Sequence, residues 1–174
     1  MYADDVSSPF RDTNHEPEIW LQSRHKWQIL GLTNSVSQIG FNHQSNGRGG
    51  DLSRSWNRIF VNFIFEKTNF ALSIKPWIDI GENKDNPDID DFLGYGEIRA
   101  GYAWKDHTLG IMIRNVLESS FEKGTVELSW SFPLWSYEYL RGYVQYFNGY
   151  GESLVDYDRH ANTIGVGVSV TDFL

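Results

Sequence analysis

The strongest constraint in the sequence is a strict alternation of apolar and polar residues over long segments. Between Phe70 and Ile80 every second residue is apolar, whereas the residues between them include Ser73, Lys75 and Asp79. Successive side chains of a β-strand point to opposite faces, so this segment predicts a strand with one apolar and one polar face. The same split recurs in three further segments, 58–66, 126–132 and 164–170.

These segments favour a membrane barrel over a soluble sandwich. They approach about ten residues, the length of a tilted membrane strand, whereas soluble strands usually have about five or six. Charged residues such as Lys75 and Arg99 stand in mid-strand on the polar face, where a polar lumen accommodates them. Short connections also alternate with long polar ones. The sequence therefore predicts an all-β, antiparallel transmembrane β-barrel of the outer-membrane type, with a soluble all-β domain as the alternative.

The number of expected strands is odd. Bacterial single-chain barrels have even strand numbers, and residues 1–17 have the composition of a long polar loop. The opening "MYADDVSSPF" also lacks the basic start and apolar run of a secretory signal. We therefore expect a single barrel domain over residues 1–174 that lacks an N-terminal piece with an odd number of strands. The nine expected strands are 18–29, 34–45, 53–65, 70–80, 91–104, 108–117, 125–133, 139–148 and 163–173.

Charge and composition exclude several classes of function. The net charge of −8 argues against nucleic acid as a partner, because phosphate binding needs a basic surface. The chain has no cysteine, which excludes a disulfide framework and a thiolate metal site.

A group of polar residues falls on the apolar face of two neighbouring strands. His43 and Ser45 continue the face of Phe41, and Asn57 continues the face of Ile59 in the next strand. If His43 pairs with Asn57, residues 46–54 form the loop and Ser45 lies at the rim beside them. Directly opposite side chains are about 5 Å apart at Cβ, so the three polar groups meet on a lipid-facing surface.

Polar groups on an apolar surface are costly unless they are satisfied or functional. The fitting chemistry is acyl transfer, with Ser45 as nucleophile, His43 as its base and Asn57 as the group that orients the imidazole. A polar hairpin tip is the alternative, because Asn46-Gly47 is a turn signal. The remaining histidines are expected to be solvated residues of loops and turns: His15, His25, His107 and His160.

With these segments in place, the chain resembles the outer membrane phospholipase A family. The matching stretches keep the family's order: "SSPFRDTNHEP" (7–17), "NHQSNGR" (42–48), "SRSWNR" (53–58), "KPW" (75–77), "DNPDI" (85–89), "GYGESLVDY" (149–157) and a closing strand "GVGVSV". The resemblance implies a twelve-stranded barrel of the bacterial outer membrane, of which about nine strands are present. It also implies a calcium-dependent serine hydrolase, active as a homodimer, that cleaves phospholipids and lysophospholipids at the outer-leaflet side.

The resemblance assigns a role to each site residue. Ser45 is the expected nucleophile, His43 the base and Asn57 the orienting group, and the Gly47 amide is the expected donor to the oxyanion.

The resemblance also implies a set of calcium ligands. These are the Arg48 carbonyl, the Ser53 hydroxyl and, from a second subunit, Ser7, while Asp85 matches a residue tied to a further calcium position. Hydroxyl and carbonyl oxygens suit calcium, which tolerates irregular shells.

Two departures from the family pattern leave alternatives open. The opening strands are absent, and the chain ends in Leu174, where barrels of this type usually end in Phe. The alternatives are therefore a catalytically inactive barrel fragment and another barrel acyl hydrolase, such as a lipid A deacylase.

Overall fold

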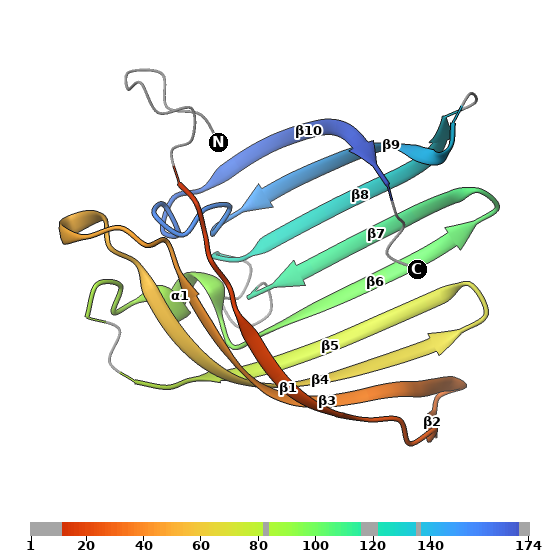
Figure 1. Cartoon of the computed structure of the whole chain (residues 1–174), viewed down its shortest axis with the longest axis horizontal. Coiled ribbons are helices and arrows are strands. Elements are labelled where there is room, and N and C mark those ends of the chain that lie inside the picture. The colour runs from red at the N-terminus through yellow and green to blue at the C-terminus, as the bar shows by residue number, and fades with distance from the viewer. Residues whose placement is uncertain (1–11, 82–83, 116–121, 135–136, 171–174) are drawn as a thin grey trace.

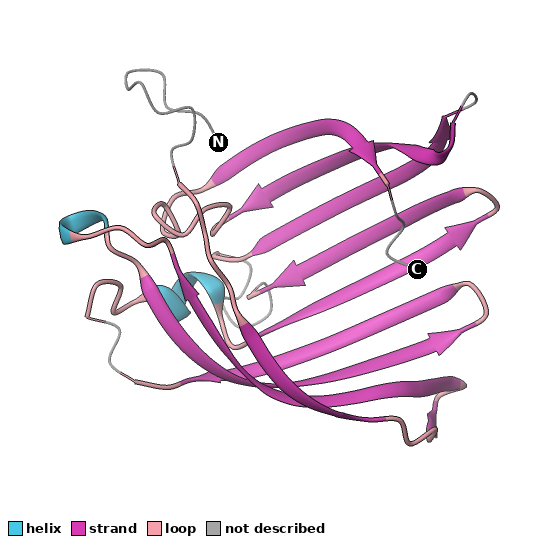
Figure 2. Ribbon diagram, viewed as in Figure 1, coloured by secondary structure: helices cyan, strands magenta, loops and turns pink. Residues whose placement is uncertain are grey.

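The computed structural model describes residues 12–81, 84–115, 122–134 and 137–170 of the chain. Strands dominate these ranges (Figure 2). The strands are β1 (Glu18–Ser23), β2 (Gln28–Ile29), β3 (Leu32–Ser45), β4 (Ser55–Lys67), β5 (Phe70–Asp79), β6 (Gly96–Trp104), β7 (His107–Arg114), β8 (Thr125–Leu134), β9 (Tyr137–Gly149) and β10 (Ala161–Ser169). A short 3-10 helix, η1, spans Gly50–Leu52, and an α-helix, α1, spans Ile89–Leu93.

The strands form one antiparallel sheet in the order β1-β3-β4-β5-β6-β7-β8-β9-β10, and β2 pairs with β3. The sheet curves strongly, and the long connections gather at one rim with α1, opposite the short β4–β5 and β6–β7 turns (Figure 1). We call these the loop rim and the turn rim. The all-β antiparallel prediction is confirmed, and so is the alternation of long and short connections. Within the described residues, β1 is paired only with β3 and β10 only with β9.

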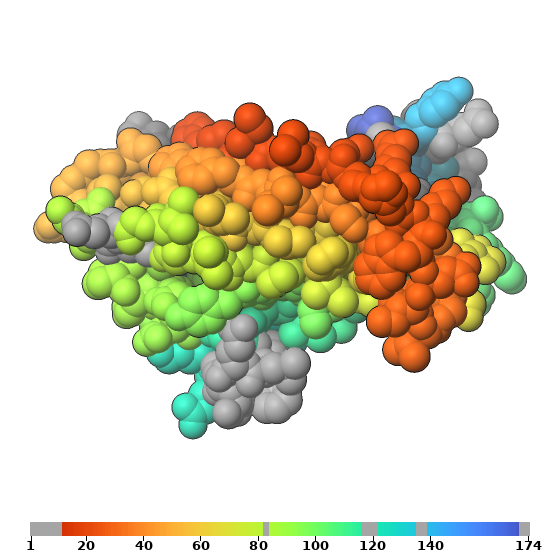
Figure 3. Space-filling model, turned by 90° about the horizontal axis from the view of Figure 1, so that it is seen from below, coloured from red at the N-terminus to blue at the C-terminus, as the bar shows by residue number. Residues whose placement is uncertain are grey.

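The two faces of the sheet differ as the alternation predicted. On the outer face, Leu128, Trp130 and Val166 expose 45%, 43% and 80% of their surface. On the concave face, Trp56 and Phe60 are buried. Seen from below, the outer face runs without a break across β3, β4 and β5 (Figure 3). Within the described residues, neither helix has the length and apolar character needed to cross a membrane.

Two expected strands differ from the structure. The expected strand 18–29 is two strands, β1 and β2, separated by residues 24–27. The expected strand 91–104 is wrong at its start, because α1 occupies Ile89–Leu93 and β6 begins at Gly96. The remaining strands agree within about two residues where they are described, while residues 116–117 and 171–174, including Leu174, lie outside the described residues.

The helix α1 closes the concave side at the loop rim. Ile89 and Leu93 are four residues apart, so they share one helical face, and both are buried. Gly94 ends the helix with φ of 64°, a conformation that favours glycine. The resulting core cluster joins α1, two strands and the loop before β10: Trp56, Phe60, Trp77, Ile89, Leu93, Leu154 and Tyr157.

A hydrogen-bonded network continues this core along the concave face. The Arg58 guanidinium is buried, donates to Glu16 at 2.6 Å and to Asn42, and lies 4.1 Å from the Trp56 ring centre. Lys75 donates to Glu18 at 2.5 Å. Lys75 is one of the charges that the alternation assigned to the lumen, and it and Arg58 both have a carboxylate partner.

Candidate active site

The hairpin of β3 and β4 positions the candidate site. Its register places His43 opposite Asn57 and Ser45 opposite Ser55, which confirms the predicted pairing and the 46–54 loop. Phe41 and Ile59 occupy the same outer face, and each exposes 38% of its surface. The polar group therefore lies at the loop rim of an apolar surface.

The side chains of His43 and Asn57 are in direct contact. His43 Nδ1 lies 2.8 Å from Asn57 Oδ1. An amide oxygen only accepts hydrogen bonds, so this contact requires the proton on Nδ1, and in the neutral imidazole the lone pair is then on Nε2. Ser45 stands two residues further along the same face, about 6–7 Å away along the strand. The arrangement matches a base whose tautomer is fixed by a third group.

An extended segment holds the backbone of the site from the other side. His15 N–H donates to the Ser45 carbonyl at 2.8 Å, and Ser45 N–H donates to the His15 carbonyl at 2.9 Å. His43 N–H donates to the Pro17 carbonyl at 3.1 Å. The expected polar loop 1–17, where it is described, is therefore attached to β3 at the site.

Three of the histidines expected to be solvated, His15, His107 and His160, have structural contacts, and the His160 ring lies 5.5 Å from the Tyr150 ring. The His15 side chain is exposed, as expected, but its ring lies within 4.0 Å of the place where a Cβ on Gly47 would stand. His107 begins β7 and accepts a hydrogen bond from the Trp130 indole at 3.1 Å. No periodicity in the sequence signals these contacts, because all of them depend on neighbouring segments.

Asn46 organises the loop that follows the nucleophile candidate. Its side chain is only 5% exposed, and its amide donates to the Leu52 carbonyl at 2.8 Å. Its side-chain oxygen accepts from Arg48 N–H at 3.3 Å and from Arg54 N–H at 3.1 Å. Gly47 has φ of 64°, in the left-handed region that favours glycine. The predicted oxyanion donor is thus part of a turn braced by side-chain hydrogen bonds.

Two of the four expected calcium ligands lie together. Ser53 donates its hydroxyl to the Asp85 carboxylate at 2.6 Å. The Asp85 loop is tied to β4, because Ser55 N–H donates to Asn86 Oδ1 at 3.0 Å. Arg48 lies in the 46–54 loop with Ser53, and its Nε is 3.8 Å from the Asp12 carboxylate. Ser7 lies outside the described residues. Among the described residues no three His, Cys, Asp or Glu side chains form a metal-binding group.

Tyr157 packs beneath this rim. Burial and a hydrogen bond to Asp88 raise its pKa above the ordinary value for tyrosine. The hydroxyl therefore stays protonated and links the start of α1 to the loop that precedes β10.

The fold and the His43–Asn57 contact define a curved antiparallel β-sheet protein with a candidate hydrolase site on its outer face. A family model described as phospholipase A1 matches residues 1–170. The chain belongs to the phospholipase A1 family. It is 38% identical over 166 residues to phospholipase A1 of Escherichia coli K12, and 36% identical over 166 residues to that of Proteus vulgaris.

Solved structures give the same result. The outer membrane phospholipase A of E. coli is similar at a TM-score of 0.90 and 38% identity, covering 97% of this chain and 68% of that one. A Salmonella typhi outer membrane phospholipase dimer with bound calcium is similar at a TM-score of 0.90 and 37% identity, covering 97% and 64%. The resemblance to this family and the predicted outer-membrane barrel fold are confirmed.

The alignments cover nearly all of this chain but only part of its relatives. The alignments include 95% of this chain but 56% of the E. coli and Proteus proteins. The chain therefore spans about half the length of these relatives.

Proposed function

We propose that the chain is a calcium-dependent serine hydrolase of the bacterial outer membrane that cleaves acyl esters of phospholipids and lysophospholipids. One observation carries the proposal: His43 Nδ1 lies 2.8 Å from Asn57 Oδ1 on the outer face that also presents Ser45. An asparagine in this role agrees with a solved E. coli relative described as an active-site mutant, in which asparagine is replaced by alanine.

The reaction begins at Ser45. Its Oγ attacks the ester carbonyl while His43 Nε2 takes the hydroxyl proton. Asn57 holds the imidazole in the required tautomer and orientation. The Gly47 N–H donates to the oxyanion that forms. His43 then returns the proton to the leaving lysophospholipid oxygen. Water hydrolyses the acyl-Ser45 ester with His43 again as base, which releases the fatty acid and restores the serine.

The position of the site suits a lipid substrate. Phe41 and Ile59 present apolar surface on the same face. An acyl chain lying against this face reaches Ser45 laterally, without entering the concave side. We place the site at the outer-leaflet side, since it lies at the rim of the long loops.

The residues near the loop fit a calcium ion. Ser53 and Asp85 bring two oxygen donors within 2.6 Å of each other, and calcium prefers oxygen ligands in flexible shells. The Arg48 carbonyl lies with Ser53 in the 46–54 loop, and we propose Ser7 of a second copy as their third partner, while Asp85 belongs to the further calcium position beside them. When bound, calcium supplies positive charge close to the developing oxyanion. A homodimer is proposed on the same grounds, with the calcium-bound Salmonella dimer as support.

Release of fatty acid from phospholipid in mixed micelles tests the function. We expect release in the presence of calcium and little release after chelation. A lipid A deacylase would instead release acyl chains from lipopolysaccharide and leave the phospholipid intact, so both substrates are presented in parallel. No release from either substrate, by protein with the heat-modifiable migration of a folded barrel, would support the inactive fragment. That alternative is favoured by the β1 and β10 edges, each with one strand neighbour in the described residues.

Asn57→Ala tests the orienting group. We expect kcat to fall by about 10- to 100-fold with little change in KM, because the His43 imidazole loses the group that fixes its orientation. Initial rates on micellar phospholipid measure both constants. Asn69→Ala, at the turn rim, is the matched control. Equal kcat values for the two variants would remove Asn57 from the mechanism.

Asp85→Asn tests the calcium ligand set. We expect calcium affinity to fall by about 10-fold, because a neutral amide oxygen replaces a carboxylate beside Ser53. Titration calorimetry measures binding directly, and the calcium dependence of hydrolysis should shift in parallel. Asp158→Asn changes the charge equally in an exposed part of the same rim. If both variants bind calcium like the unchanged chain, Asp85 is not a ligand.

A further inference from the structure

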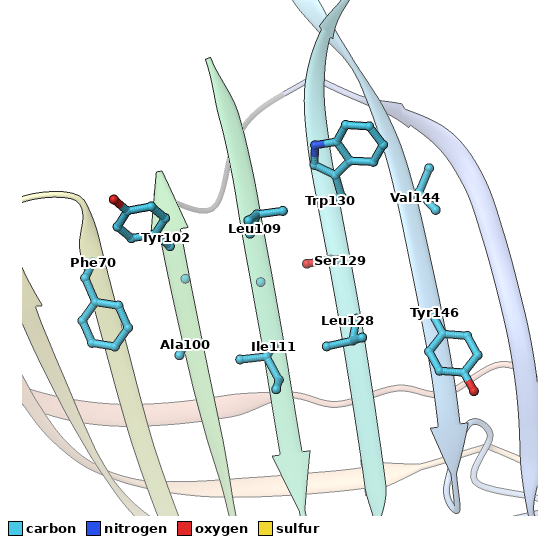
Figure 4. A pocket seen from close by; sticks show the side chains of 12 residues that line it. Phe70, Ala100, Tyr102, Leu109, Ile111, Leu128, Ser129, Trp130, Val144 and Tyr146 are labelled. Carbon is cyan, nitrogen blue, oxygen red and sulfur yellow. The ribbon is translucent and has the colours of Figure 1, made fainter. Parts of the chain in front are cut away.

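A second apolar feature lies on the outer face, well away from the hairpin of β3 and β4. A groove of about 490 Å³ opens across β6, β7, β8 and β9. Figure 4 shows the side chains that line it, from β6 to β9 together with Phe70 of β5. The groove is lined by Ala100, Tyr102, Leu109, Ile111, Trp130 and Tyr146, among others.

The register explains the hollow. One cross-strand row runs Tyr102, Leu109, Trp130 and Val144, and the next row towards the loop rim runs Ala100, Ile111, Leu128 and Tyr146. Ala100 has the smallest side chain in the second row, so the sheet is thin at that point. The larger Tyr102, Trp130 and Tyr146 side chains form the walls. The groove is therefore built by a small residue surrounded by aromatic ones.

A polar cluster stands at the turn-rim end of the groove. Trp130, a wall residue, donates to His107 Nδ1 at 3.1 Å. The His107 ring lies 5.8 Å from the Trp104 ring, and the Lys105 ammonium lies 5.9 Å from the same indole. These contacts form a continuous path from the apolar groove to a cation.

The charge of the turn rim adds to this cluster. Lys67 ends β4 and pairs with the groove residue Phe70 of β5, and Lys105 lies in the β6–β7 connection. The charged side chains described at this rim are the cations Arg24, Lys26, Lys67, Lys105 and Arg141 and the anions Glu66 and Asp106. A cationic rim on a chain of net charge −8 concentrates positive charge at one end of the barrel.

We propose that the groove and the Trp104–Lys105–His107 cluster bind one anionic phospholipid of the leaflet at the turn rim. An acyl chain lies between Tyr102, Trp130 and Tyr146, and the phosphate meets the Lys105 ammonium. Lysine pairs with phosphate as a point charge, and aromatic side chains suit the depth of the membrane interface. Anionic headgroups are favoured because basic residues near a membrane surface each add about 1 kcal/mol of attraction.

This lipid is not a substrate. The groove begins at the turn rim of β6 to β9, whereas Ser45 lies at the loop rim of β3. The bound lipid therefore acts as a structural ligand, and the inference does not depend on the proposed hydrolase activity.

The test uses the whole chain folded in detergent micelles, with phosphatidylglycerol as probe. We expect native mass spectrometry to retain one phosphatidylglycerol and to retain phosphatidylcholine about 10-fold less. Lys105→Glu should reduce phosphatidylglycerol retention by about 10-fold. Ala100→Trp, which fills the hollow, should abolish it. Matched controls that should retain the lipid are Lys84→Glu, at the loop rim, and Ile98→Trp, on the outer face of the same strand.

Several results would overturn the proposal. Equal retention of both lipids, or unchanged retention in Lys105→Glu, would show nonspecific lipid around the barrel. If inorganic phosphate alone stabilises the protein against heat as much as phosphatidylglycerol does, the cluster binds a free anion. If Ala100→Trp loses heat-modifiable migration, the Lys105→Glu result decides alone. None of these outcomes alters the expected fatty-acid release, so failure here is separate from failure of the proposed function.

Discussion

Replacing Ser45 by alanine is expected to reduce phospholipid hydrolysis by a factor on the order of 10⁴ or more. The substitution removes the only atom of this residue that forms the acyl-enzyme, whereas His43 and Asn57 keep their 2.8 Å contact. Loss of a nucleophile in serine hydrolases leaves only the contribution of binding and of the oxyanion donors. Fatty-acid release from micellar phospholipid, followed by titration or mass spectrometry, measures the effect.

Ser55→Ala is the matched control for this prediction. Ser55 lies directly opposite Ser45 in the β3–β4 register and occupies the same rim. We expect its replacement to leave the rate within a few-fold of the unchanged chain. If Ser45→Ala and Ser55→Ala have similar rates, Ser45 is not the nucleophile.

Arg58→Ala is expected to lower the free energy of unfolding by about 3 kcal/mol. The buried guanidinium donates to Glu16, Asn42 and Gln44, and its removal leaves their oxygens without these hydrogen bonds. Urea unfolding in lipid vesicles, followed by tryptophan fluorescence, measures the change.

The control for this substitution is Arg99→Ala. Arg99 pairs with Glu97 at 2.9 Å, but its side chain is 52% exposed, so its loss should cost at most about 1 kcal/mol. Equal losses in the two variants would contradict a special role for the buried network. A larger loss in Arg58→Ala should also lower activity, because Glu16 lies between His15 and Pro17, whose backbones hold Ser45 and His43.

The sequence predicts the sheet and the hairpin well because both follow from a period of two. Alternation assigns His43 and Asn57 to one face, and a loop of fixed length then sets their register. The contact at 2.8 Å is the consequence of that register. The predicted roles of these residues in catalysis remain predictions, as do those of Gly47 and Arg48.

The sequence did not predict the features that leave no periodic pattern of apolar and polar residues. The helix α1 has five residues in an acidic loop, too short for a helical pattern to be visible. The attachment of His15 to Ser45 depends on backbone hydrogen bonds between segments 30 residues apart, which leave no mark in the residue types. The groove at Ala100 arises from four neighbouring strands, so it becomes visible only once their register is known.

The central claim is that Ser45 is a nucleophile activated by His43, and covalent labelling tests it directly. A serine-reactive fluorophosphonate loses fluoride and forms a stable phosphonate ester only with an activated hydroxyl. We predict one adduct per folded chain, found by peptide mass spectrometry on Ser45 and prevented by His43→Ala. No adduct on Ser45 in protein that shows heat-modifiable migration, or equal labelling after His43→Ala, would contradict the claim.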